Sequence, residues 1–501
     1  MAEHAPPPPA TPPASTSRRF ANPLLEHVLG AWTADGRPSW RVRARRAAGR
    51  LKRGGGGLTQ GLRSAVVDHP VVAGRRRDAG PRVVWFSYLN AARDPHRVAF
   101  LAGLAAALEA AGSTLDVRYQ DFGGAPPPAA LGRGCRLRPV RLLGAELPPG
   151  GRPPRRAVAA GLAAAGGGLR LRAAARAFSA TKRLPRRAGL ERAAYVAWSA
   201  GRALGGPADA AVVWNQFSAV SRAVVAVCER RGVPVRYAHE GVLPGSLVIE
   251  AGGQMADSPL AQQAADPPPV TDAELAATRA YLVRVAAART SRKPPEQAAD
   301  AAALDGLEGP VLFYAGQNDE AAGFWPRSLP RARHHSPSFA STEDALAALQ
   351  EVARVRRFTV LFKPHPSRRE RHGDRPLGGV LDPAVTRYAP GADVFGCIDR
   401  ADAVATIVSQ VAYLALIRAT PVLLLGRMPL TGWGCCTELA ARDRLPAAVG
   451  AALAGGPAGA DAAFLRHCTV ARTRHLLPYD PAVAGHFPRT LAEAAADLAS
   501  A

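Results

Sequence analysis

The chain has 501 residues, of which 48% are hydrophobic, and this length favours two or three domains with sizeable cores. Its formal net charge is +24, but almost all of the excess lies in residues 1–80 and 131–200. This distribution argues against a nucleic-acid-binding protein, because no nucleic-acid module is readable and aromatic residues are not interleaved with the basic runs. The two basic segments are interpreted either as docking sites for an anionic membrane surface or as solvated arginine-rich faces that reflect codon usage.

Residues 1–78 are rich in proline, arginine and glycine and predict a disordered tail, with at most a short helix at 24–32. Order begins with an apolar, β-branched strand at 83–88. Further strands are predicted at 115–119, 210–214 and 233–239, and helices at 98–111, 155–205 and 219–231. This alternation predicts a doubly wound α/β domain at 79–290.

A second alternation follows a helix at 271–288, for which Thr271 and Glu274 predict a capping box. Residues 289–309 are interpreted as a linker. Strands are then predicted at 311–315, 359–363, 403–407 and 421–425, and helices at 342–356, 410–418 and 490–498. We expect a second Rossmann-like domain at 291–501 that faces the first across a cleft, with the last helix packing back on the first domain.

Polar side chains follow three strands of the second domain. Gln317 follows strand 311–315, Lys363 and His365 lie in a Lys-Pro-His-Pro loop, and Ser409-Gln410 follows strand 403–407. The carboxyl ends of parallel strands form the usual ligand crevice of such folds. The prolines stiffen the loop that carries the lysine and the histidine, and a serine at a helix start predicts an N-cap beside unpaired N–H groups. Together these residues predict a phosphate-binding site.

Candidate catalytic carboxylates occur on both sides of the expected cleft. Asp319 and Glu320 follow strand 311–315, where either could act as a base or as a nucleophile. In the first domain, Asn215 ends one strand and His239-Glu240 ends the next. We interpret these three as acceptor-side residues, with Glu240 as a base; a carboxylate-capped turn is the equal alternative.

Trp433, in a Gly-Trp-Gly segment, predicts either a wall for a base or sugar or a buried anchor. No metal-ligand spacing is recognisable, including at His334-His335, and there is no dinucleotide fingerprint or Walker loop, so we expect neither a metal nor a cofactor. Six cysteines without a Cys-x-x-Cys pair, no signal core and no long apolar run predict a cytoplasmic protein, with peripheral attachment to the inner membrane face as an open possibility.

These segments, in this order, resemble the capsule polysaccharide biosynthesis family, the bacterial β-Kdo transferases of capsule lipid-linker synthesis. The resemblance covers about residues 205–440. It is carried by Trp214-Asn215, Glu240-Gly241, Gly316-Gln317, the Phe-Lys-Pro-His-Pro segment 362–366, Ser409-Gln410 and Gly432-Trp433-Gly434. It implies a GT-B fold, a CMP-sugar donor such as CMP-Kdo, a glycan or glycolipid acceptor, and no metal requirement.

The resemblance also implies roles for single residues. His365 and Ser409 would contact the donor phosphate with Lys363 nearby, and Asp319 would be the catalytic acid. In the family that acid stands four residues after the glutamine, a position that Ala321 occupies here. Polymerases that use CDP-glycerol and bacterial sialyltransferases share a similar arrangement and remain alternatives, as does a non-enzymatic, basic membrane- or nucleic-acid-binding protein.

Overall fold

The computed structural model describes residues 81–89, 95–121, 135–139, 152–206, 208–289, 301–366 and 379–500, all within the compact unit Asp78–Ala501. The predicted tail at 1–78, with its short helix, lies outside the described residues. So does part of the second basic segment. Among the described residues, no helix combines the length and the apolar content needed to cross a bilayer.

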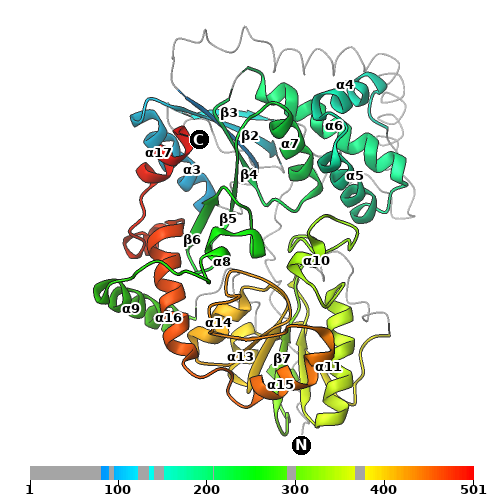
Figure 1. Cartoon of the computed structure of the whole chain (residues 1–501), viewed down its shortest axis with the longest axis vertical. Helices are drawn as coiled ribbons and strands as arrows, with labels where there is room; N and C mark the ends of the chain where they lie inside the picture. Colours follow the sequence, from blue (N-terminus) through cyan, green and yellow to red (C-terminus); the bar gives the residue numbers. More distant parts are fainter. Residues whose placement is uncertain are drawn as a thin grey trace, which may run out of the picture. The chain divides into compact units, whose positions relative to one another are not determined.

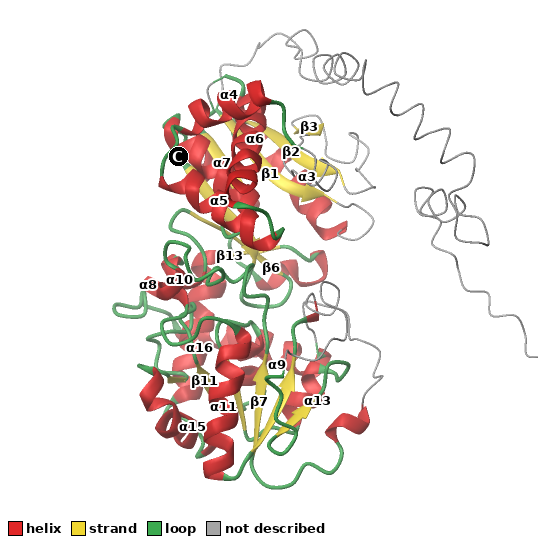
Figure 2. Cartoon of the chain, turned by 90° about the vertical axis from the view of Figure 1, so that its right-hand side faces the viewer, coloured by secondary structure: helices red, strands yellow, loops and turns green. Residues whose placement is uncertain are grey.

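The first sheet has seven strands in the order β13-β6-β5-β4-β1-β2-β3 (Figures 1 and 2). Its strands are β1 (Arg82–Leu89), β2 (Thr114–Asp121), β3 (Cys135–Pro139), β4 (Ala210–Trp214), β5 (Val235–Glu240), β6 (Ser246–Glu250) and β13 (Leu476–Pro478). In this order the strands from β5 to β3 run parallel to one another. Strand β6 pairs antiparallel with both of its neighbours, β5 and β13. The apolar run at 246–250 was not predicted as a strand.

Helices cover both faces of this sheet. They are α3 (Pro95–Ala110), α4 (Arg155–Ala165), α5 (Leu169–Thr181), α6 (Arg186–Leu204) and α7 (Ala219–Arg230). Because side chains alternate along a strand, Val83 and Trp85 of β1 pack toward α3, while Val84 and Phe86 pack toward α5–α7. Helices α4 and α6 meet backbone to backbone, since a Cβ on Gly161 would lie 1.7 Å from the carbonyl oxygen of Ala194.

The second sheet is parallel throughout, in the order β12-β11-β10-β7-β8-β9. Its strands are β7 (Val311–Ala315), β8 (Thr359–Lys363), β9 (Thr386–Tyr388), β10 (Ala403–Thr406), β11 (Val422–Leu424) and β12 (Thr437–Glu438). Every residue of β7 is buried, as expected of an interior strand that is covered on both faces. Figure 1 shows α11 (Thr342–Arg356) on one side of β7, and α13 (Val394–Asp399) and α14 (Val411–Ile417) on the other.

The chain after the second sheet returns to the first. Helices α15 (Leu445–Leu453) and α16 (Ala460–Val470) lead to β13, which joins β6, and α17 (Leu491–Ala499) packs on α3. Leu498 belongs to the same buried cluster as Phe100 and Leu104. The predicted return of the last helix is confirmed, whereas the strand β13 was not predicted.

Helix α9 (Asp272–Ala288) carries the predicted capping box: Thr271 Oγ1 accepts from Glu274 N, and the Glu274 carboxylate accepts from Thr271 N. It packs against α14 and α16 rather than against the helices of the first sheet. With two mainly parallel sheets and helices on both sides, the predicted α/β, GT-B-like fold class is confirmed.

Candidate functional site

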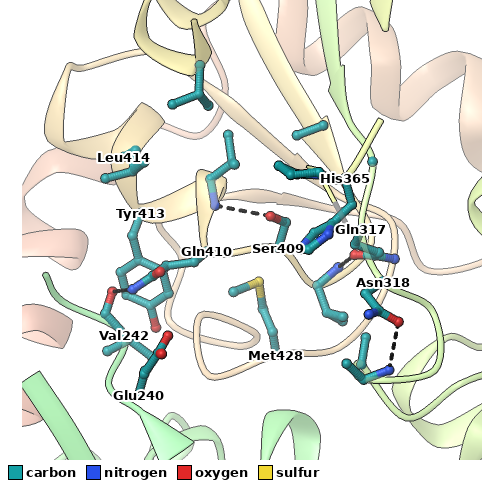
Figure 3. A pocket seen from close by; sticks show the side chains of 18 of the residues that line it. Glu240, Val242, Gln317, Asn318, His365, Ser409, Gln410, Tyr413, Leu414 and Met428 are labelled. Carbon is teal, nitrogen blue, oxygen red and sulfur yellow. Dashed lines mark hydrogen bonds between the residues drawn. The ribbon is translucent and has the colours of Figure 1, made fainter. Parts of the chain in front are cut away.

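A cavity of about 380 Å³ lies between the carboxyl ends of β4 and β5 of the first sheet and those of β7, β8 and β10 of the second (Figure 3). Its lining includes eight of the predicted site residues: Asn215, His239, Glu240, Gln317, Lys363, His365, Ser409 and Gln410. Asp319, Glu320 and Trp433 are not among the lining residues. The Rossmann-like architecture therefore brings most of the predicted constellation into one space.

The Lys-Pro-His-Pro loop leaves β8 directly beside the end of β7. Gly316 N donates to the carbonyl oxygen of Lys363 at 2.9 Å, and a Cβ at this glycine would lie 3.2 Å from Pro364 Cα. The two strand ends therefore approach so closely that a side chain at this position would push them apart by a few tenths of an ångström. Lys363 is 8% exposed and its Nζ donates to the carbonyl oxygen of Pro390 at 3.2 Å, while His365 is half-buried in the cavity wall.

Helix α14 begins at Val411, one residue later than predicted, and Gln410 stands at the N-cap position. The Ser409 hydroxyl nevertheless accepts from Val411 N at 3.3 Å, so the predicted serine side chain does cap the start of the helix. The Ser409 N–H donates to the Thr406 hydroxyl at 3.2 Å. The Thr406 hydroxyl in turn donates to the carbonyl oxygen of Ala315 at 3.2 Å. These bonds fix the backbone of Ser409, and its side chain lies at the cavity (Figure 3).

Gln317 ties the ends of two neighbouring strands together. Its Oε1 accepts from Val408 N at 2.8 Å, which fixes the orientation of the amide. The side chain is 8% exposed, and its Nε2 has no hydrogen-bond partner in the part of the chain that the structure describes. Such a buried donor is a polar group that a bound ligand or water would satisfy.

Two side-chain amides connect the walls of the cavity. Gln410 Nε2 donates at 2.9 Å to the carbonyl oxygens of both Gly241 and Val242, across the space between the two sheets. Asn215 adopts a left-handed backbone conformation (φ 56°), which asparagine tolerates better than most residues. Its Nδ2 donates to the carbonyl oxygen of Ala321 at 3.4 Å. Both predicted ligand-binding residues thus also hold the cavity together.

Two carboxylates line the cavity, Glu240 and Asp393. Asp393 caps α13 by accepting from Gly396 N at 2.9 Å, and it pairs with Arg289 at 3.0 Å. Glu240 enters from the first sheet at the end of β5, on the other side of the cavity from His365 in Figure 3. The neighbouring His239 contacts the Glu240 carbonyl oxygen through Nδ1 at 2.8 Å. Glu240 is therefore the better placed of the two carboxylates for chemistry.

The two acids after β7 face other partners. Both oxygens of Asp319 accept from Thr342 at the start of α11, from N at 2.9 Å and from Oγ1 at 2.5 Å. Glu320 accepts from the hydroxyl of Thr181 at 2.9 Å. A carboxylate at a helix N-terminus stabilises the unpaired N–H groups there, which is a structural task. Ala321 does line the cavity, at the position where the resemblance expects an acid.

Trp433 is a buried anchor rather than a wall of the site. It is 8% exposed, its Nε1 donates to the carbonyl oxygen of Leu260 at 3.3 Å, and its ring packs edge-on against His467 at 4.7 Å. Of the two sequence-based interpretations, the structure supports the anchor.

Several lining residues were not predicted. Tyr413, Leu414 and Met428 supply apolar surface, and Gln254 and Asp393 supply polar groups. The Tyr413 hydroxyl bonds His467 Nε2 at 2.8 Å, and burial raises the pKa of this tyrosine well above its usual value, so the phenol stays neutral. Met428 follows β11 at the same carboxyl edge as the predicted motifs, and that position is the signal that could have found it.

Comparison with known proteins gives remote likenesses. No protein-family model matches the chain, and no curated protein matches it. Among solved structures, KpsC from Thermosulfurimonas dismutans matches as a β-Kdo 2,7-transferase, with 16% identity over 58% of this chain and 84% of that one and a TM-score of 0.36. Its β-Kdo 2,4-transferase matches with 13% identity over 58% and 87% and a TM-score of 0.40. The calicheamicin glycosyltransferase CalG4 matches with 13% identity over 84% and 98% and a TM-score of 0.31. Identities and TM-scores this low carry no argument about the reaction.

Proposed function

We propose that the chain is a glycosyltransferase that moves Kdo or a related acidic sugar from a CMP donor to a glycan or lipid-linked acceptor, without a metal requirement. The observation that carries the proposal is that His365 and Ser409 of the second sheet line one cavity with Glu240 of the first. Phosphate-binding donors on one wall and a carboxylate on the other are what transfer from a nucleotide to a hydroxyl needs.

On the donor side, negative charge develops on the CMP phosphate as its bond to the sugar breaks. In this proposal His365 and the Ser409 hydroxyl, which both line the cavity, donate to the phosphate oxygens, and the Lys363 ammonium adds a nearby positive charge. A donor aimed at such a developing charge in a water-poor cleft contributes roughly 3 kcal/mol to the transition state. The unpartnered Nε2 of Gln317 supplies a further buried N–H close to the same strand ends.

On the acceptor side, Glu240 is proposed as the general base. It takes the proton of the acceptor hydroxyl, whose oxygen forms the new bond to the anomeric carbon. The electron pair of the broken bond goes to the phosphate of CMP. This assignment replaces Asp319, whose carboxylate is engaged at the start of α11.

The decisive experiment offers CMP-Kdo, CMP-sialic acid and CDP-glycerol side by side to the purified chain, after calorimetry has measured its affinity for CMP. We expect CMP binding and sugar transfer from a CMP donor. If product forms only with CDP-glycerol, the reaction is phosphotransfer and not sugar transfer. Absence of CMP binding, together with salt-sensitive binding to nucleic acid or to vesicles, would favour the non-enzymatic alternative.

The arginines of α4–α6 favour a further element of the proposal, peripheral attachment to an anionic membrane. Arg155, Arg172 and Arg186 are exposed, and Leu169 at the start of α5 is 76% exposed among them. Basic side chains near an anionic bilayer contribute about 1 kcal/mol each. Cosedimentation with phosphatidylglycerol vesicles, but not with phosphatidylcholine vesicles, is the expected result. Equal binding to both, or to neither, would remove this element and leave the transfer reaction untouched.

A further inference from the structure

A second cavity, of about 340 Å³, opens beside the first and has a markedly polar lining. Its ionisable side chains come from α5, α7, β5, the turn Met255–Asp257 and the segment around α10 (Ala332–His335), namely Arg170, Arg222, Tyr237, Asp257, Arg331 and His335. None of them was predicted as a site residue.

A thin wall separates the two cavities. Asn215 lines the first cavity, whereas the next residue, Gln216, lines the second. Likewise Met255 belongs to the first and Asp257 to the second. The wall is held by Gln216 N, which donates to Oε1 of Gln254 at 3.0 Å. The second cavity therefore adjoins the side of the site from which Glu240 enters, without sharing the residues proposed to bind the donor.

The charges in the second cavity do not cancel. Arg331 pairs with Asp257, and Arg170 pairs with Glu229 at 2.6 Å. Arg222 donates through Nε to the carbonyl oxygen of Phe217 at 2.9 Å, and it has no carboxylate within ion-pair distance among the described residues. Burial, together with the nearby charge of Arg170, lowers the pKa of Arg222 to about 10, and the group stays protonated at neutral pH. Arg222 is thus left without a direct ion pair among the described residues, and the carboxylate of Glu320 acts on it only from farther away.

Tyr237 brings a second unsatisfied donor. The residue is 7% exposed, lines the cavity, and its hydroxyl makes no hydrogen bond with any described residue. Burial raises the pKa of Tyr237, so the hydroxyl keeps its proton. His335 is 2% exposed and its Nε2 faces the Asp257 carboxylate at 3.5 Å, so this ring adds no donor to the cavity. A guanidinium without a direct ion pair and a tyrosine hydroxyl without a hydrogen-bond partner form an incomplete site, which an oxyanion would complete.

We propose that this second cavity binds a carboxylate or phosphate group of the acceptor, held by Arg222 and Tyr237. The inference rests on the proposed function, since it places the anionic group of the acceptor across the wall from Glu240. An arginine fork with a hydroxyl donor matches the geometry of a planar carboxylate or of a phosphate. A neutral sugar would leave the guanidinium without its counter-charge. The acceptor class is therefore an acidic or phosphorylated glycan.

Calorimetry with D-glucuronate, inorganic phosphate and D-glucose tests the inference on the full chain. We expect the wild type to bind glucuronate, phosphate or both, and not glucose. Arg222→Gln should weaken anion binding at least tenfold, and Tyr237→Phe severalfold. Arg172→Gln is the matched control, because this α5 arginine is exposed and does not line the cavity. CMP affinity should stay within twofold in all three variants.

The outcomes separate this site from the first. Binding of phosphate alone would assign a phosphorylated acceptor, and binding of glucuronate alone an acidic sugar. Failure of both anions to bind, an equal loss of anion binding in Arg172→Gln, or displacement of the anion by CMP would overturn the proposal.

If Arg222→Gln does not fold, Tyr237→Phe decides, since it keeps the ring and removes only the hydroxyl. Unchanged anion binding in Tyr237→Phe would then overturn the proposal. Anion binding without any CMP binding would instead remove the proposed function and leave the second site standing.

Discussion

The side-chain amide of Gln410 donates to the carbonyl oxygen of Gly241 at 2.9 Å, and so joins the start of α14 to the loop after β5. The same nitrogen reaches Val242 at the same distance. One side chain of the second sheet therefore fixes the backbone next to Glu240, the proposed base. This contact therefore helps to set the position of that carboxylate relative to His365.

Gln410→Ala removes both hydrogen bonds. Because each contributes about 0.5–1.5 kcal/mol net, we expect the free energy of unfolding to fall by about 1–3 kcal/mol. Amide hydrogen exchange in the loop 241–245 should speed up, while exchange in β1 stays unchanged as an internal control. Unaltered exchange in the loop would show that contacts other than Gln410 hold this loop against the second domain.

His365→Ala and Ser409→Ala should each lower turnover at least about tenfold, because each removes a proposed hydrogen-bond donor to the leaving phosphate. Steady-state kinetics with a CMP donor measures the effect, and circular dichroism checks the fold. His96→Ala is the control, as this histidine is exposed and does not line the cavity. Wild-type rates in both site variants would refute the phosphate-binding role.

The sequence predicted best what depends on neighbouring residues. Strands β7 and β8 and helix α11 were predicted with the observed bounds, because apolar runs and caps are local signals. Strand β13 was missed because it exists only through pairing with β6, far away in the chain. A three-residue strand such as β9 carries too little pattern to be recognised.

For the site, the sequence identified the loops but not the direction of each side chain. Gln317 and Asp319 lie two residues apart, yet one lines the cavity and the other holds Thr342. Only the position of α11 decides which acid becomes its N-terminal partner. Gln410 was expected to bind the donor, whereas its amide nitrogen donates to the carbonyl oxygen of Gly241 on the opposite side of the cavity. Such choices depend on tertiary contacts that a local pattern does not contain.

Glu240→Gln and Asp319→Asn distinguish two candidate carboxylates. If Glu240 is the base, its amide variant should lose about 100-fold or more in turnover with little change in stability. Asp319→Asn should keep most of its turnover and lose about 0.5–2 kcal/mol of stability, because the charge at the start of α11 is removed. Steady-state kinetics measures the loss of turnover in both variants, and urea unfolding measures the loss of stability. The reverse pattern would return the catalytic role to Asp319.

Glu250 gives the fold a pH dependence that a single substitution can isolate. It is buried on β6, where burial raises its pKa from 4.5 to about 8, although the Ser258 hydroxyl, which donates to Oε1 at 3.1 Å, opposes the rise. The folded state therefore holds a proton that the unfolded state releases above pH 4.5. Stability from this group is present below pH 4.5 and is lost as the pH rises toward 8, by at most about 1.4 kcal/mol per unit.

Glu250→Gln keeps the shape of the side chain and cannot ionise. We expect urea unfolding between pH 6.5 and 8 to show a falling free energy of unfolding for the wild type and a flatter profile for the variant. Below pH 6.5 the buried His467 acts in the opposite direction, since burial lowers its pKa to about 3 and the folded state takes up its proton less readily. The comparison is therefore made above that pH. Parallel profiles for the two proteins would mean that the Glu250 carboxyl ionises normally in the fold.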